Sequence, residues 1–189
     1  MTNLDTLPDG PQAAIRAATE AYLAGGSLKA WQNAMRRAIT SAHTAAYIAA
    51  QADRIGVPPS LIRPNALSRI ERAELRAIVD RQLKYFDGFV ADVQAGKMSP
   101  AQILARADMY GDAVRGSYYA MRWGDWDIPT NLLPGNQQCK ARCLCRISVR
   151  DNGDGTGVLL REMGGTENHC TECPPLAGEY QVKRRKEMK

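Results

Sequence analysis

The sequence predicts a mainly α-helical protein that ends in a small Cys-rich β-hairpin module, and three observations lead to this fold class. Up to about residue 124, apolar side chains recur at steps of three and four, the period of one helix face. From Asp125 onwards, Pro and Gly become frequent and short alternating stretches replace that period. All five cysteines lie within the last 51 residues. We therefore expect a helical region over 1–124, of about four helices, and a separate Cys/His-rich module with its own core and a basic tail over 125–189.

Composition and charge limit the class of protein. The chain has 189 residues, 44% of them hydrophobic and 24% charged, as in ordinary globular proteins and unlike disordered or collagen-like chains. The uncharged stretch Ala38–Ala52 is shorter than the roughly 20 residues of a membrane-spanning helix, and the first residues do not resemble a signal peptide. We therefore expect no membrane contact and a reducing cytoplasmic site of synthesis. The net charge of +5 suits an anionic partner such as DNA.

The first two helices are predicted from their end signals. Pro11 can occupy the first turn of a helix that Gly25 and Gly26 close. Ser27 is a plausible N-cap for a long second helix that ends at Gly56. The apolar stripe of this second helix consists largely of Ala, so another helix can approach it closely.

Two further helices begin at capping boxes. Ser68 and Glu71 have the Ser-x-x-Glu spacing in which each residue bonds the other's backbone N–H. Ser99 and Gln102 repeat the pattern, with a Pro at the first helical position. The fourth helix is expected to continue without a break to Gly124.

His43 and a group of aromatic residues could be mistaken for functional residues. His43 has no Cys, Asp or Glu one helical turn away, so we interpret it as a core or surface residue and not a metal ligand. Tyr118, Tyr119, Trp123 and Trp126 crowd the end of the fourth helix. Aromatic side chains at helical spacing usually pack in a core or interface, and a platform for stacking nucleic-acid bases is the less favoured interpretation.

A β-hairpin is expected after the helices. Ile147–Val149 and Val158–Leu160 are short alternating stretches on either side of Asp151–Gly155, which contains Asn-Gly and Asp-Gly turn signals. A calcium loop at the same place would need a 12-residue loop closed by Glu, which the sequence lacks. Since a hairpin brings its two ends together, the Cys groups that flank it should be neighbours.

That juxtaposition predicts a structural zinc site of the zinc-ribbon type. Zn²⁺ takes four thiolate or imidazole ligands, in pairs separated by two to four residues. The best set is Cys139, Cys143, Cys170 and Cys173; Cys145 could replace Cys139, and His169 could be a ligand or support one. Five cysteines cannot all pair, yet a disulfide or unliganded thiols stay open as alternatives. A Cys-x-x-Cys redox site is disfavoured because no helix follows the motif.

A second function to weigh is binding of nucleic acid by the Cys-rich module. Basic residues near the predicted zinc site and at the chain end could contact phosphates, and several such contacts would make DNA affinity fall steeply with salt. The candidates are Lys140, Arg142, Arg146, Lys183, Arg184, Arg185 and Lys186. An enzyme is not expected, since the chain has two histidines and no His-Glu-x-x-His, Gly-x-Ser-x-Gly or phosphate-binding Gly loop.

The order of motifs in the last third of the chain resembles a known family. Leu133-Pro-Gly, the Cys-x-x-x-Cys-x-Cys group that begins at Cys139, a hairpin, and His-Cys-x-x-Cys ending at Cys173 are similar to the C-terminal motif of minor head, or head morphogenesis, proteins of tailed bacteriophages. Arg142 and Ile147 stand where that pattern often has Asn and Trp.

The resemblance implies a structural role in the virion. A member of this family would be a minor head component, made in the bacterial cytoplasm and bound to portal or major capsid subunits during head assembly. It would form homo- or hetero-oligomers and could contact packaged DNA. In such a protein the helices bind other head subunits and zinc stabilises the C-terminal module.

Overall fold

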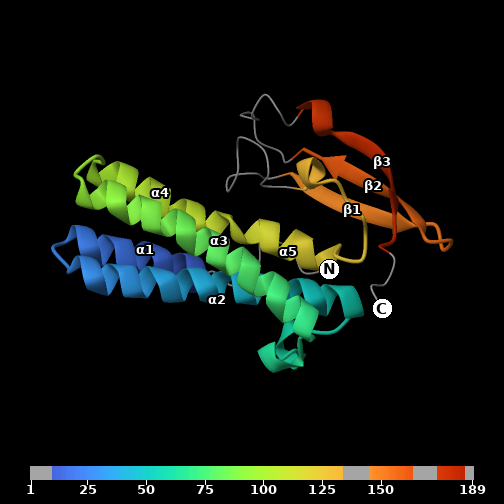
Figure 1. Cartoon of the computed structure of the whole chain (residues 1–189), viewed down its shortest axis with the longest axis horizontal. Helices are drawn as coiled ribbons and strands as arrows, with labels where there is room; N and C mark the ends of the chain where they lie inside the picture. The colour runs from blue at the N-terminus through green and yellow to red at the C-terminus, as the bar shows by residue number, and fades with distance from the viewer. Residues whose placement is uncertain (1–9, 134–144, 164–173, 186–189) are drawn as a thin grey trace.

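A computed structural model describes residues 10–133, 145–163 and 174–185, and it is mainly helical with a small antiparallel sheet (Figure 1). The α-helices in these ranges are α1 Gly10–Leu23, α2 Leu28–Ile55, α3 Arg69–Gln94, α4 Pro100–Asp112 and α5 Val114–Arg122. The strands are β1 Arg146–Asp151, β2 Thr156–Glu162 and β3 Gly178–Lys183. None of the helices so described is both long and apolar enough to cross a bilayer.

The predicted helix ends are confirmed for α2, α3 and α4. Ser27 accepts a hydrogen bond from the Ala30 N–H at 3.2 Å, and both predicted capping boxes are formed, by Ser68 with Glu71 and by Ser99 with Gln102. These bonds satisfy backbone N–H groups that have no partner inside the first helical turn. The sequence thus determines where each of these helices begins.

The expected fourth helix is interrupted, so the prediction of one continuous helix was wrong. Its first part, α4, ends at Asp112 and α5 begins at Val114, with Ala113 between them. The Gly116 N–H bonds the Ala113 carbonyl at 3.2 Å, a tighter i to i+3 turn than the α-helical pattern. The two helices continue in roughly the same direction (Figure 1).

The predicted hairpin is confirmed but it is part of a larger sheet. Strands β1 and β2 pair antiparallel on either side of the Asp151–Gly155 turn, and β3 pairs with the other edge of β2. This third strand, residues 178–183, was not predicted from the sequence. Tyr180 and Val182 alternate with polar residues and share a face with Leu159 and Ile147, which is the pattern of a half-buried strand.

Two groups of buried side chains form the hydrophobic core. The bundle cluster lies between α1, the first half of α2, the second half of α3, and α4. Its aromatic residues contact one another, with the Trp31 ring edge-on to both Phe86 and Phe89 at centroid distances of 5.5 and 5.4 Å. Its buried members are Ile15, Trp31, Met35, Ala38, Ile39, Phe86, Phe89, Val90, Val93, Ile103, Ala107 and Tyr110.

The junction cluster joins the helices to the sheet. It contains helical residues such as Tyr47 and Tyr119 together with Trp126, Leu159 and Val182 from the region after residue 124. Its buried members are Ala46, Tyr47, Ala49, Ala50, Leu67, Tyr118, Tyr119, Met121, Trp126, Ile128, Leu132, Ile147, Leu159 and Val182. The expectation that the two regions have separate cores was therefore wrong, because this apolar contact is continuous across residue 124.

Replacing Gly by Ala should change the free energy of unfolding in opposite directions at two positions that have equal free space around them. A Cβ at either Gly88 or Gly56 would meet nothing within 4 Å, but Gly56 has φ +73° at the C-cap of α2 and Gly88 lies inside α3. Gly88→Ala should raise the free energy of unfolding by about 0.5–1 kcal/mol. Gly56→Ala should lower it by about 1 kcal/mol. Urea denaturation of both variants checks the sign, and a stabilising Gly56→Ala would contradict the left-handed cap.

Candidate metal centre

The chain segments that carry the predicted ligands attach to one end of the sheet. Arg146, the first residue of β1, lies opposite Glu162, the last residue of β2. On the other side of β2, Arg161 lies opposite Gly178, the first residue of β3. Residues 134–144 lead into β1, and residues 163–177 connect β2 to β3. The register therefore brings the three attachment points together across adjacent strands, about 4.8 Å apart.

Most of the predicted ligands lie outside the described residues. Cys139, Cys143, His169, Cys170 and Cys173 all belong to residues 134–144 and 164–173, so the zinc site itself stays a prediction. Elsewhere, across 10–133, 145–163 and 174–185, no three His, Cys, Asp or Glu side chains gather closely enough to hold a metal ion.

Cys145 is the one predicted ligand that the structure describes. It directly precedes β1 and is 2% exposed. Ile147, two residues further along, is also buried and belongs to the junction cluster. Cys145 therefore lies at the edge of the hydrophobic core, an environment typical of a structural thiol.

Arg161 is buried beside this end of the sheet and was not among the residues predicted from the sequence. Its side chain is 1% exposed, and its Nη1 donates hydrogen bonds to the carbonyls of Asn131 at 3.2 Å and Leu132 at 2.8 Å. The guanidinium thus fixes the short 3₁₀ turn η4, Thr130–Leu132, just before the segment that contains Cys139. The alternation of β2 is the signal that could have found it, since Leu159 is buried and Arg161 falls on the same face.

The predicted phosphate contacts do not form one basic surface within the described residues. Arg146 begins β1 opposite the carboxylate of Glu162, whereas Lys183 ends β3 opposite Thr156. These basic residues are at opposite ends of strands of six or seven residues, which separates them by roughly 17 Å or more. Of the remaining candidates, Lys140, Arg142 and Lys186 lie outside the described residues.

Arg184 is committed to contacts within the protein. It forms an ion pair with Asp151 and lies over the Trp126 ring, 5.2 Å from its centroid. The Gly153 N–H and the Arg184 guanidinium hold the pKa of Asp151 below its usual range. Backbone hydrogen bonds also join residues 183–185 to residues 125–127. The Asp127 N–H donates to the Lys183 carbonyl and the Arg185 N–H donates to the Asp125 carbonyl, both at 2.8 Å.

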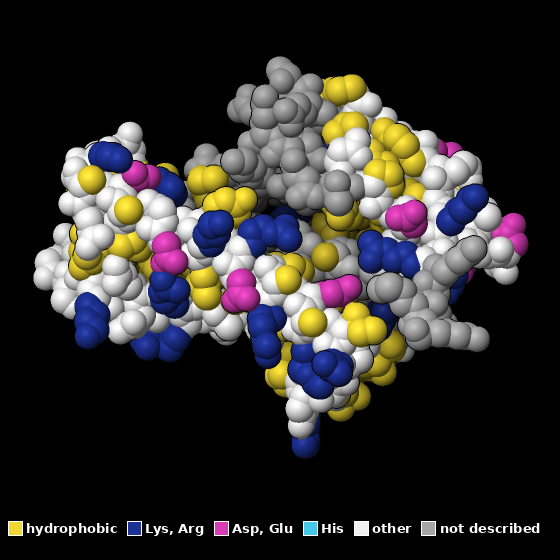
Figure 2. All heavy atoms as spheres, viewed as in Figure 1, with side chains coloured by type: hydrophobic (Ala, Val, Ile, Leu, Met, Phe, Trp, Pro, Cys, Tyr) yellow, Lys and Arg dark blue, Asp and Glu magenta, His cyan; other side chains and the backbone are white. Residues whose placement is uncertain are grey.

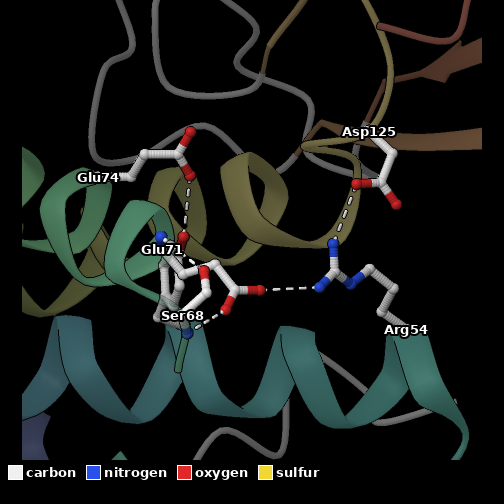
Figure 3. Close-up of polar contacts among 6 residues, drawn as sticks. Arg54, Ser68, Glu71, Glu74 and Asp125 are labelled. Atoms are coloured by element: carbon white, nitrogen blue, oxygen red, sulfur yellow. Dashed lines mark hydrogen bonds and ion pairs between the residues drawn. The ribbon is translucent and has the colours of Figure 1, made fainter. Parts of the chain in front are cut away.

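Polar contacts also join the helices to the segment that leads to the sheet (Figure 3). Arg54, near the end of α2, bonds Glu71 of α3 at 2.8 Å and Asp125 at 3.1 Å. Glu71 also accepts from the Ser68 N–H at 2.7 Å, so one carboxylate caps α3 and binds the neighbouring helix. These pairs are partly exposed and contribute about 1 kcal/mol or less each, so their main effect is on geometry.

His43 lies in the core, one of the two places, core or surface, that the sequence left open for it. It is fully buried between α2 and α5, where its Nδ1 lies 2.5 Å from the Ser117 hydroxyl oxygen. Its Nε2 has no hydrogen-bond partner among the described residues. Burial lowers the pKa of His43 to about 4, so the ring is neutral at pH 7.

This burial predicts a pH dependence of stability. The unfolded chain binds a proton at His43 below its ordinary pKa of about 6.5, whereas the folded chain binds it only near pH 4. Stability should therefore fall by about 3 kcal/mol as the pH is lowered from 6.5 to 4, and change no further through His43 below that. The measurement is urea denaturation from pH 7 to 4 on the wild type and on His43→Asn. The variant should lack this part of the decline, and equal slopes would contradict the assignment; His169 contributes equally to both proteins.

Comparisons with known proteins show no match for this chain among protein-family models, curated proteins or solved structures. The resemblance of its cysteine pattern to phage head proteins therefore stands on the residues of this sequence.

Proposed function

We propose that the chain is an assembly protein of a bacteriophage head, whose cysteines hold a structural Zn²⁺ at the end of the sheet where β1 begins and β2 ends. The observation that carries the metal site is the strand register. Arg146 pairs with Glu162, and Arg161 pairs with Gly178, so both Cys-bearing segments begin from adjacent strands.

Chain length supports the same arrangement. Cys143 is three residues before Arg146, and Cys173 is five residues before Gly178. An extended chain covers at most about 3.6 Å per residue, so the Cα atoms of these two cysteines lie within roughly 11 and 18 Å of the first residues of their strands. Since β1 and β3 both flank β2, and are thus about 10 Å apart, one ion can reach ligands from both segments.

The proposed ligand set is Cys139, Cys143, Cys170 and Cys173. The burial of Cys145 beside the junction cluster supports its assignment as the cysteine that is left over. His169 would then support the site through a hydrogen bond to a ligand, or replace one thiolate. Zinc bound in this way stabilises a small β-module that buries little apolar surface of its own.

The role in head assembly rests on the resemblance of the motif order that ends at Cys173. The order of the fold supports it, since a helical region precedes the β-module. In this role the helices bind portal or major capsid subunits, and the metal module fixes the C-terminal end of the protein in the virion. Stable co-purification with portal or capsid subunits in co-expression is the expected result, and its absence with both would contradict the assembly role.

The metal site has a direct test with an internal control. Elemental analysis of the full chain, purified without chelator, should give about one Zn²⁺ per chain, with most thiols protected until a chelator is added. Cys170→Ser and Cys139→Ser should lose the metal, because three ligands hold Zn²⁺ poorly, whereas Cys145→Ala should keep it. Metal-free protein, or metal retained by both ligand variants, would overturn the site; loss from Cys145→Ala would overturn the ligand assignment.

A further inference from the structure

The connection between α2 and α3 projects from the side of the helical bundle (Figure 1). It consists of residues 55–70, which we call the knob: the end of α2, the short 3₁₀ turns η2 Pro59–Leu61 and η3 Pro64–Ala66, and the start of α3. Figure 2 shows a projection at this place that carries both hydrophobic and basic side chains. No functional residue was predicted in this segment from the sequence.

The knob exposes large apolar side chains that a folded protein usually covers. Ile55 is 53%, Leu61 71% and Ile70 61% exposed. The other exposed large apolar side chains in the described residues are Tyr85, at 60%, and Met163, at 41%. Three of these five therefore fall within 16 residues of the chain, and we take this concentration as the sign of an interaction site.

Hydrogen bonds and prolines fix the backbone of the knob around Leu61. The N–H groups of Leu61 and Ile62 bond the carbonyls of Pro58 and Pro59, each at 3.0 Å, so η2 is a closed turn between rigid prolines. A flexible loop could fold its apolar side chains against the protein, but this one keeps them exposed. Little conformational entropy of the knob backbone would then be lost when a partner binds.

The charge that the knob presents outward is positive. Residues 55–70 contain two Arg and no Lys, Asp or Glu, and the next turns of α3, residues 71–76, add Arg72 and Arg76 together with two carboxylates, Glu71 and Glu74. Both carboxylates are occupied, Glu71 by Arg54 and the cap of α3, and Glu74 by the Tyr47 hydroxyl at 3.0 Å (Figure 3). The structure describes no ion pair for Arg63, Arg69 or Arg76, which are exposed.

We propose that the knob binds an acidic, apolar segment of a protein partner. Apolar side chains of the partner cover Leu61 and Ile70, and its carboxylates pair with Arg63 and Arg69. Arg suits this role better than Lys because its planar group binds a carboxylate through two hydrogen bonds and is enriched in protein interfaces. Nucleic acid would satisfy the arginines but leaves the aliphatic side chains poorly covered. This inference deepens the proposed function by giving the chemistry of the assembly partner.

The test is selection of binding peptides from a random library displayed on ribosomes, with the full-length protein as bait. The enriched peptides should combine Asp or Glu with Leu, Ile or Phe. Their affinity should fall at least tenfold for Leu61→Ser/Ile70→Ser and for Arg63→Glu/Arg69→Glu. The matched controls on α3 outside the knob are Tyr85→Ser, which removes an equally exposed apolar side chain, and Arg81→Glu/Lys84→Glu, which makes the same charge change. These controls should leave affinity unchanged.

Several results would overturn the proposal. The proposal is wrong if no peptide is enriched or if the enriched peptides lack acidic residues. It is also wrong if the peptides bind the knob variants as tightly as they bind the wild type. Tighter binding to phosphatidylglycerol vesicles than to the best peptide, lost in the same variants, would assign the knob to a lipid surface instead. Zinc analysis of the same preparations separates the two proposals, since metal-free protein that still binds acidic peptides through the knob contradicts the metal site alone.

Discussion

Trp126→Ala is expected to lower the free energy of unfolding by about 3–5 kcal/mol and to loosen both the sheet and the end of the helical bundle. The Trp126 side chain is 5% exposed and belongs to the junction cluster. Its backbone bridges to Arg184 at the end of β3, and its ring lies against Gly157 of β2. Removing the ring leaves a cavity where the helices and the sheet share their core.

Hydrogen exchange followed by mass spectrometry shows which elements lose stability in this variant. Amides of β2 and of α5 should both exchange faster in Trp126→Ala, since the junction cluster contains residues of both. Tyr85→Ala is the control, because it removes an aromatic ring that is 60% exposed and should cost about 0.5 kcal/mol or less. Faster exchange in the sheet alone would show that the two regions are stabilised independently, as the sequence analysis assumed.

A larger residue at Gly157 tests the contact between the Trp126 ring and β2 independently. A Cβ added at Gly157 would lie 2.7 Å from the Trp126 ring and 3.0 Å from the Arg150 carbonyl oxygen. Gly157→Ala should therefore destabilise by about 1–3 kcal/mol, even though Gly88→Ala stabilises. In Trp126→Ala the added methyl group no longer meets the ring, and only the contact with the Arg150 carbonyl oxygen remains, so the double variant should lose less than the sum of the two single changes.

The helices could be predicted from the sequence because local residues determine their ends. Ser27, Ser68 and Ser99 each bond an N–H within three residues, and such contacts depend on nothing distant in the chain. The break at Ala113 could not be predicted in this way, since Ala favours a continuous helix. The hairpin was predictable because its turn residues lie between its own strands.

Features that depend on distant parts of the chain were missed. Residues 178–183 become a strand because β2 offers them a free edge, and that edge exists only once the hairpin has formed. The shared core depends on Trp126, Leu159 and Tyr119 meeting in space. For the metal site, the sequence predicted ligands by spacing, and the structure adds the register that brings their segments to one end of the sheet.

Arg161→Met is the second change with a large expected effect, a loss of about 3–5 kcal/mol in stability. Met fills a similar volume but cannot donate hydrogen bonds, so the buried carbonyls of Asn131 and Leu132 lose bonds to a charged donor. Arg150→Met is the control, because it makes the same chemical change at an exposed position of β1 and should cost about 0.5 kcal/mol or less. Urea denaturation of both variants measures the difference.

The same variant connects the buried guanidinium to the proposed metal site. Arg161 fixes the turn that immediately precedes residues 134–144, which carry Cys139 and Cys143. If this anchoring holds those thiols in place for binding, Arg161→Met should weaken zinc affinity about 10- to 100-fold in competition with a chelator, as changes to groups that support ligands do. Arg150→Met should not change it. Lower stability with unaltered zinc affinity would limit Arg161 to a role in the core, because the metal ligands would then be positioned without it.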